Sequence, residues 1–252
     1  MATFYYIYAA VIGLFLGSFF NVVGLRVPKG ESIIRPRSHC PKCQHTLGAG
    51  ELVPFFSYIF LKGSCRSCGT KISPVYPVTE IATSLLFLVT AWLMGWSPEL
   101  IIAWTLASLL MMIVITDIHY MVIPNKILIV FAMIFVVERL FIPLNPWWNM
   151  FIGAATGFMM LLLIALVSKN GMGGGDIKLF AVLGLVLGWK GVLLAFLFSA
   201  FYGTIIGGGG IILGKVRRGQ PMPFGPAIAL GTMTVYLWGD AFIEWYYQFF
   251  LN

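Results

Sequence analysis

Long apolar runs alternate with short polar connections along this chain of 252 residues. A helix needs about 20 apolar residues to cross a hydrocarbon layer of about 30 Å, and most of the runs approach that length. The pattern therefore predicts an all-α fold, a polytopic membrane bundle of about eight spans. The expected spans are residues 4–25, 81–97, 99–116, 127–143, 148–168, 178–189, 191–214 and 225–250.

Composition leads to the same class of protein. Apolar residues make up 60% of the chain and charged residues 10%, whereas a soluble domain carries about 25% charged residues. Too few polar side chains remain to cover a water-exposed surface, which excludes a soluble enzyme, a disordered regulator and a small secreted disulfide protein. The first run has no basic segment before it and no small-residue cleavage site after it, so we expect a retained span and not a signal peptide.

The basic residues are unevenly distributed among the connections. The net charge is +7, and fourteen of the sixteen Lys and Arg lie in or at the edges of connections 26–79, 117–126, 169–178 and 215–224. Lys and Arg accumulate in cytoplasmic loops of membrane proteins. We therefore expect these four connections in the cytoplasm and both termini outside. Topology accounts for the charge, so membrane lipid is an expected partner and nucleic acid is not.

All four cysteines lie in connection 26–79, as Cys40-Pro-Lys-Cys43 and Cys65-Arg-Ser-Cys68. Two Cys-x-x-Cys pairs about twenty residues apart have the spacing of a four-thiolate zinc site, and Gly69 suits the turn after the second pair. Such a site has no open position, so zinc would be structural and would help a small loop to fold. The alternative is two redox-active dithiols or idle thiols. We expect three regions: a first span 1–25, the cytoplasmic zinc loop 26–79 and a membrane-embedded core 80–252.

Two acids stand out among the few within or beside the spans, where ionisable groups are costly and therefore functional candidates. Asp117 follows one apolar run and Asp176 opens another, after Gly173-Gly174-Gly175. The topology places both at the cytoplasmic ends of their spans. Two carboxylates that meet share a proton and supply an acid and a base at one site. The alternative is helix capping, which suits Asp176 at a helix N-terminus better than Asp117 at a C-terminus.

Other polar and glycine-rich positions have simpler interpretations. Glu138 can pair locally with its neighbour Arg139, and Gly207 to Gly210 indicate a kink or close helix packing. Pro223-Phe224-Gly225-Pro226 is either a turn that starts the last span or part of a substrate groove.

Five ordered motifs resemble those of bacterial type IV prepilin peptidases, intramembrane aspartyl proteases of the Gly-x-Gly-Asp type. The resemblance extends over essentially the whole chain. The motifs are Gly17-Ser18-Phe19-Phe20-Asn21-Val22, the double Cys-x-x-Cys loop, Asp117-Ile118-His119-Tyr120-Met121-Val122-Ile123-Pro124-Asn125, Gly173-Gly174-Gly175-Asp176 and Pro223-Phe224-Gly225-Pro226. The chain departs from the family at Asn125, where an acid is common, and near His119, where acids or Arg occur.

The resemblance implies a hydrolase of the bacterial plasma (inner) membrane with Asp117 and Asp176 as its catalytic pair. It would cleave the short basic leader of prepilins or pseudopilins of a pilus, type II secretion or competence system. Cleavage would follow a Gly on the cytoplasmic face. Gly173, Gly174, Gly175, Pro223, Phe224 and Gly225 would form the substrate groove.

The resemblance also implies a second activity, N-methylation of the new N-terminal residue with S-adenosylmethionine. Gly17, Asn21 and Glu80 are the first candidates for that cofactor, because the expected topology places them near the cytoplasmic boundary. No glycine-rich nucleotide loop supports this independently of the resemblance. The alternatives to a peptidase are a membrane transporter that uses the two aspartates and a non-enzymatic pilus or secretion assembly factor.

Overall fold

The computed structural model of the protein describes residues 2–168, 173–214 and 222–250, and the described part is helical with irregular loops. Four basic residues of the expected cytoplasmic connections lie outside the described residues: Lys169, Lys215, Arg217 and Arg218. Chain contacts divide the protein into two units, residues 1–95 and 96–252. The predicted boundary at residue 80 falls inside a helix of the first unit.

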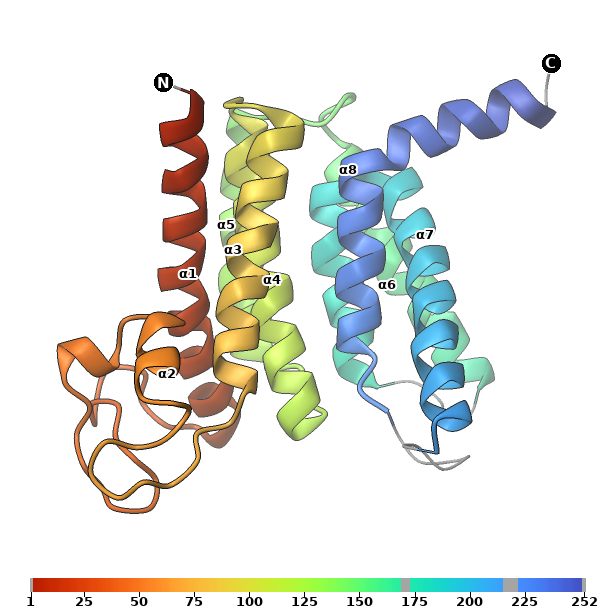
Figure 1. The fold of residues 1–252 in the computed structure, drawn as a ribbon. Helices are drawn as coiled ribbons and strands as arrows, with labels where there is room; N and C mark the ends of the chain where they lie inside the picture. Colours follow the sequence, from red (N-terminus) through yellow and green to blue (C-terminus); the bar gives the residue numbers. More distant parts are fainter. Residues whose placement is uncertain (1, 169–172, 215–221, 251–252) are drawn as a thin grey trace. The chain divides into compact units, whose positions relative to one another are not determined.

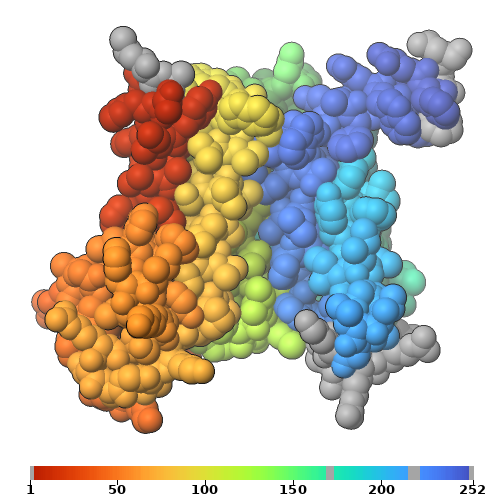
Figure 2. Space-filling model, in the orientation of Figure 1, coloured from red at the N-terminus to blue at the C-terminus, as the bar shows by residue number. Residues whose placement is uncertain are grey.

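The first unit is a pair of long helices that carries the cysteine loop at one end. Helix α1 (Ala2–Arg26) runs beside α3 (Val75–Met94), as Figure 1 shows. Between them lie η1 (Val27–Lys29), η2 (Ala49–Glu51) and the short helix α2 (Phe56–Phe60). Residues of this connection, coloured orange, form one lobe at the end of the pair (Figure 2).

The α1–α3 contact depends on small residues in α1. The Cα of Gly17 faces the backbone of Glu80, and a Cβ at residue 17 would lie 2.8 Å from the Cα of Glu80. One turn further along α3, Ser84 donates a hydrogen bond of 2.8 Å to the carbonyl of Ala10 in α1. Small residues let apolar helices approach closely in lipid, where no hydrophobic force drives helices together. The pair is therefore held by close packing and interhelical hydrogen bonds.

The described residues of the second unit form five helices. They are α4 (Glu99–Tyr120), α5 (Asn125–Phe141), α6 (Asn149–Val167), α7 (Gly174–Ile212) and α8 (Gly225–Phe250). Helix α7 packs against α5, α6 and α8, and α4 packs against α5 and α8. The largest fully buried side chains, such as Phe135, Phe180 and Leu109, form the core of this unit.

Helix α7 is folded back on itself. Its 39 residues would span about 58 Å if straight, but Gly188 has φ 69° and ψ −179°, which only glycine adopts easily. The rings of Phe180 and Phe196 lie 5.9 Å apart, whereas sixteen residues of straight helix would separate them by about 24 Å. The first segment of α7 (174–187) and the second (189–212) therefore form an antiparallel hairpin, in line with the separate runs 178–189 and 191–214.

Among residues 2–168, 173–214 and 222–250, five helices are long and apolar enough to cross a membrane: α1, α3, α4, α6 and α7. The all-α membrane fold is thus confirmed. The count of eight spans is not confirmed and stays a prediction.

Candidate active site and metal centre

Asp117 is buried near the C-terminal end of α4, where it meets the start of α8. The backbone N–H of Gly225 donates a hydrogen bond of 2.6 Å to Asp117 Oδ2. The free N–H groups at a helix N-terminus carry partial positive charge and favour an anion. Asp117 lies near the C-terminal end of its own helix, where no free N–H groups are available to it. The N-terminus of α8 supplies the favourable interaction instead.

The contact requires glycine at residue 225. A Cβ there would lie 2.9 Å from both the Cβ and the Oδ2 of Asp117, too close for either atom. Pro223-Phe224 leads into α8, which begins at Gly225. The segment therefore does start a helix, and the same backbone holds the carboxylate of Asp117.

Asp176 is the third residue of α7, and its carboxyl group lies within electrostatic range of Asp117. The loop after α4 passes against the start of α7, so that a Cβ at Gly175 would lie 2.8 Å from Ile123. Gly173 and Gly174 are exposed, and a Cβ at Gly174 would meet nothing within 4 Å. The glycine run thus permits one close backbone contact and leaves open surface beside Asp176.

The neighbouring polar residues support the α4–α5 corner. Lys178 Nζ donates to Asn125 Oδ1 at 3.0 Å, which joins the start of α7 to the start of α5. His119 Nδ1 lies 2.9 Å from the carbonyl oxygen of Ile115 in its own helix. Asn125, where the family often has an acid, therefore pairs with a lysine here.

The four cysteine sulfurs converge on one point. All four Sγ atoms lie within 4.8 Å of one another, with Cys40 and Cys68 3.8 Å apart and Cys43 and Cys65 3.9 Å apart. A tetrahedral zinc ion with Zn–S bonds of about 2.3 Å would separate its sulfurs by roughly 3.8 Å. The donor set therefore fits zinc, and Cys40, Cys43, Cys65 and Cys68 would hold it.

The two cysteine pairs form equivalent knuckles. The N–H of Cys40 donates to the carbonyl of His45, as Cys65 does to Thr70. The residue after each pair has positive φ, 58° at Gln44 and 69° at Gly69. The turn expected at Gly69 is confirmed, and its counterpart uses a glutamine in a conformation that L-residues rarely adopt.

Two features next to the sulfurs suit metal binding. The hydroxyl of Thr70 lies 3.2 Å from Cys68 Sγ, and hydrogen bonding from Thr70 lowers the pKa of the Cys68 thiol to about 6, whereas burial and the neighbouring thiols raise the pKa of Cys43 to about 12. Thiolates, not thiols, bind metal. His45 points away to Glu51, with Nε2 3.2 Å from Oε2, so the histidine supports the loop outside the sulfur cluster.

The three residues expected near the methyl donor lie together between α1 and α3. Asn21 accepts a hydrogen bond of 2.8 Å from Thr79 and donates to the carbonyl of Tyr76. Glu80 accepts a hydrogen bond of 2.7 Å from the N–H of Phe55, a residue in the cysteine loop. Both side chains are buried. The cluster therefore joins the cysteine loop to the helix pair.

The expected local pair of Glu138 and Arg139 is wrong. Arg139 makes two hydrogen bonds to the carboxylate of Glu99, at 3.0 and 2.9 Å, while Glu138 accepts one of 2.6 Å from Thr105. Neighbouring residues on a helix point about 100° apart, so each finds a partner on another face. Sequence reasoning also missed the N–H groups of Gly225 and Phe55, because backbone donors leave no residue-type signal.

Comparison with known proteins places both units in one family. The family description "Bacterial Peptidase A24 N-terminal domain" matches residues 11–94, and "Type IV leader peptidase family" matches residues 104–208. The chain is 46% identical to a protein of Bacillus subtilis (strain 168) named "Prepilin leader peptidase/N-methyltransferase", over 96% of this chain and 98% of the relative.

Relatives of the same name occur in other bacteria. One from Aeromonas salmonicida (strain A449) is 32% identical over 96% of this chain and 94% of its own length. One from Pseudomonas aeruginosa is 30% identical over 95% and 92%. No solved structure matches the chain significantly. With aspartates, cysteines and helices in the expected order and relatives that match it end to end, the chain belongs to the type IV leader peptidase family.

Proposed function

We propose that this chain cleaves the short basic leader of a prepilin or pseudopilin, with Asp117 and Asp176 as its catalytic pair. The observation that carries the proposal is the meeting of α4, α7 and α8: Gly225 holds Asp117 by a 2.6 Å hydrogen bond, and Asp176 lies within electrostatic range. The relatives named prepilin leader peptidases support the substrate class.

The pair fits the chemistry of an aspartic peptidase. Two neighbouring carboxyl groups share one proton, so one is a base and the other an acid. The hydrogen bond from Gly225 stabilises negative charge on Asp117, which suits the base. Asp117 takes a proton from water as the water oxygen bonds to the scissile carbonyl carbon, and the protonated Asp176 stabilises the carbonyl oxygen. The C–N bond then breaks, and the leaving amine receives a proton from the pair.

The open glycine run supplies a place for the substrate backbone. Gly173 and Gly174 are exposed beside Asp176, and no atom would contact a Cβ at Gly174. An extended peptide can therefore approach the carboxyl groups without a side chain in its path. Gly173 to Gly175 and Pro223 to Gly225, which flank the two aspartates, form the proposed groove.

Charge distribution supports a site that faces the cytoplasm of a bacterium. The aspartates lie at the ends of α4 and α7 that adjoin the basic connections, and such connections stay in the cytoplasm. A leader that carries Lys or Arg is retained on the same side for the same reason. Cleavage is therefore expected at the cytoplasmic surface of the plasma membrane.

The names of the relatives support N-methylation of the product as a second activity. The side chains of Asn21 and Glu80 do not fit a role in direct binding of S-adenosylmethionine, because both are buried and paired within the chain. We assign them, with Gly17, to holding the zinc loop against α1 and α3. Zinc is structural in this proposal: the four cysteines would hold it, and it takes no part in the peptidase chemistry.

The test is cleavage by the purified full chain of a prepilin whose basic leader ends in Gly. Asp117→Asn and Asp176→Asn keep side-chain size but remove the shared proton, so each should lower cleavage by about a thousandfold or more. Asp240→Asn, an exposed acid of α8, is the matched control. Mass spectrometry of the product with and without S-adenosylmethionine tests methylation. Undiminished cleavage by either aspartate variant would overturn the catalytic pair.

A further inference from the structure

The short helix α2 in the cysteine loop turns an apolar face outward. Phe56, Ile59 and Phe60 are three and four residues apart, so they share one side of the helix, and all three side chains are exposed. Tyr58 points the other way, where its hydroxyl donates a hydrogen bond of 3.4 Å to the carbonyl of Ile72. Helix α2 is therefore anchored to the loop on one side and presents apolar side chains on the other.

A hydrogen bond fixes the level of α2 along the α1–α3 pair. The N–H of Phe55, the residue before α2, donates to Glu80 at 2.7 Å. Glu80 lies five residues inside α3, about 7.5 Å from the first residue, Val75. The backbone of Glu80 faces Gly17, and α1 continues from Gly17 for about 14 Å to Arg26. Helix α2 therefore begins beside the helix pair and not beyond its end, as Figure 1 shows.

This level corresponds to the edge of the hydrocarbon layer. The 20 residues of α3 extend for about 30 Å, which equals the thickness of that layer, and α3 is apolar enough to cross it. With α3 across the membrane, Val75 lies at the boundary of the hydrocarbon and the start of α2 lies close to the same boundary. Apolar faces of surface helices are buried about 5–10 Å into this region. The exposed face of α2 is thus at the depth where lipid chains begin.

The connection that contains α2 is also basic. Residues 27–74 include seven Lys or Arg and two acids. Lys62 follows α2 by two residues, and Lys62, Arg66 and Lys71 are exposed. Anionic lipid attracts basic residues beside an apolar face, and each one near the surface strengthens binding by about fivefold. The apolar face and the positive charge together match the surface of an anionic membrane.

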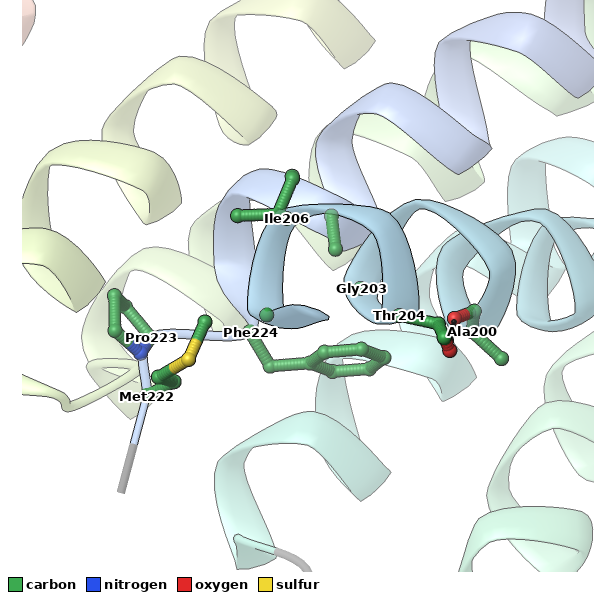
Figure 3. A pocket seen from close by; sticks show the side chains of 9 residues that line it. Ala200, Gly203, Thr204, Ile206, Met222, Pro223 and Phe224 are labelled. Atoms are coloured by element: carbon green, nitrogen blue, oxygen red, sulfur yellow. Dashed lines mark hydrogen bonds between the residues drawn. The ribbon is translucent and has the colours of Figure 1, made fainter. Parts of the chain in front are cut away.

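Other apolar surface in the chain has a simpler explanation. Figure 3 shows a cavity between the second segment of α7 and the residues that lead into α8, with the ring of Phe224 beneath α7. Its volume is about 270 Å³, and none of the described residues that line it is charged. Since α7 is long and apolar enough to cross a membrane, lipid chains are the ordinary surroundings of apolar side chains on it. Helix α2 has five residues and cannot span, so its apolar face needs another account.

We propose that α2 is an interfacial anchor: Phe56, Ile59 and Phe60 insert into the leaflet on their own side of the membrane, and the basic residues of the connection bind the headgroups of anionic phospholipid. The anchor holds the cysteine loop against the bilayer between its two attachments to α1 and α3. It goes beyond the proposed peptidase function and depends on neither aspartate.

Ile34 provides a matched control for exposure without depth. Its side chain is 78% exposed, close to the 81% of Phe60. Arg26, the last residue of α1, donates hydrogen bonds of 3.1 and 2.8 Å to the carbonyls of Ser32 and Pro36. These bonds hold the segment around Ile34 at the end of α1, about 14 Å further along that helix than the level of α2. Ile34 is therefore expected in water.

The test attaches a photoreactive side chain to each position in the full chain. Phe60→p-benzoylphenylalanine and Ile34→p-benzoylphenylalanine are reconstituted in vesicles and illuminated, and mass spectrometry identifies the attached molecule. Burial of one large apolar side chain favours the membrane by about tenfold to a hundredfold, so attachment to phospholipid should be about tenfold or more higher at residue 60 than at residue 34. Both positions are exposed, and thermal unfolding in detergent checks that each variant is folded.

Lipid composition tests the basic residues. Attachment at residue 60 should be several-fold higher in vesicles of phosphatidylcholine with phosphatidylglycerol than in phosphatidylcholine alone, and the difference should shrink at high salt, which screens charge. The same label at Ile59, on the same face, repeats the measurement if the Phe60 variant does not fold.

Three results would overturn the anchor. One is equal attachment to lipid at residues 60 and 34, which would place the α2 face no deeper than Ile34. Another is attachment of residue 60 to a second copy of the chain in place of lipid, which would make the face a protein interface. The third is equal attachment in neutral and anionic vesicles, which would remove the basic residues from the interaction.

Discussion

The guanidinium group of Arg139 donates a hydrogen bond of 2.7 Å to the carbonyl oxygen of Val186, two residues before the break in α7. The same side chain binds Glu99 at the start of α4, and Glu99 accepts a hydrogen bond of 2.8 Å from Tyr236 of α8. Arg139 itself belongs to α5. This one network therefore joins four helices, among them the three that contribute Asp117, Asp176 and Gly225.

Removal of Arg139 should destabilise the second unit. Arg139→Met keeps an apolar stem but leaves Glu99 without its partner and the Val186 carbonyl without a donor. Breaking a buried ion pair from one side costs about 3–5 kcal/mol, and the partial exposure of Glu99 places the expected loss near the lower end. Thermal unfolding in detergent measures it, with the exposed Lys190→Met as control. Equal stability of the two variants would show that the hydrogen bonds of Arg139 do not stabilise the second unit.

Tyr236→Phe removes a smaller part of the same network than Arg139→Met does. It removes one hydroxyl and changes little else, so only the hydrogen bond to Glu99 is lost. Interhelical hydrogen bonds in membrane proteins contribute about 0.6 kcal/mol on average and up to about 1.7 kcal/mol. The midpoint of thermal unfolding should therefore fall by less than in Arg139→Met. In the double variant the two losses should be clearly less than additive, because both act through Glu99.

Gly225→Ala should lower the rate of cleavage by about a hundredfold without unfolding the chain. The added Cβ would lie 2.9 Å from Asp117 Oδ2, so the carboxyl group or the start of α8 must move. A displacement of about 1 Å at a catalytic group costs about a hundredfold in rate. The check is kcat for prepilin cleavage beside thermal unfolding, with Gly209→Ala as the control in open space. Full activity in Gly225→Ala would show that the contact does not position Asp117.

The two cysteine knuckles have different residues at the position of positive φ, and this difference leads to a prediction. Gln44 has φ 58° where its counterpart is Gly69, and a non-glycine residue in this region costs about 1–2 kcal/mol. Gln44→Gly relieves that strain, so the loop should retain zinc against a higher concentration of chelator. Gly69→Gln should have the opposite effect. If both variants release zinc at the same chelator concentration as the unchanged chain, the knuckle geometry does not govern metal retention.

Much of this architecture can be predicted from the sequence, because helices that cross lipid are long and apolar. The polar connections between the apolar runs mark the helix ends. Two separate apolar runs, 178–189 and 191–214, already indicate the α7 hairpin, which turns at Gly188. The four-cysteine cluster follows equally from spacing, since short knuckles are local. Contacts between distant segments are different: Arg139 pairs with Glu99, forty residues away, and not with its neighbour Glu138. Nothing in residue type alone selects that partner, nor the backbone N–H groups that bind Asp117 and Glu80.

The last prediction concerns pH and the fold of the cysteine loop. The carboxylate of Glu51 accepts a hydrogen bond of 2.8 Å from the N–H of Gly48 and lies 3.2 Å from His45. These two interactions lower the pKa of Glu51 below its ordinary value. A group with a lowered pKa in the folded state stabilises the fold above its unfolded pKa, about 4.3 for Glu. That contribution is lost as the pH falls through the lower, folded value.

Glu51→Gln keeps the shape of the side chain but removes its charge. The variant should unfold at a lower temperature than the unchanged chain at pH 6–7, and the gap should close once the pH falls well below about 4. Acid also releases metal from thiolates, but it does so in both chains, so the difference between them isolates the carboxylate. Gln44, which lies on the same loop and carries no charge, provides the control: the gap between Gln44→Gly and the unchanged chain should not follow this titration. A Glu51→Gln gap that persists unchanged into acid would mean that packing, and not the ionised carboxyl group, stabilises the turn.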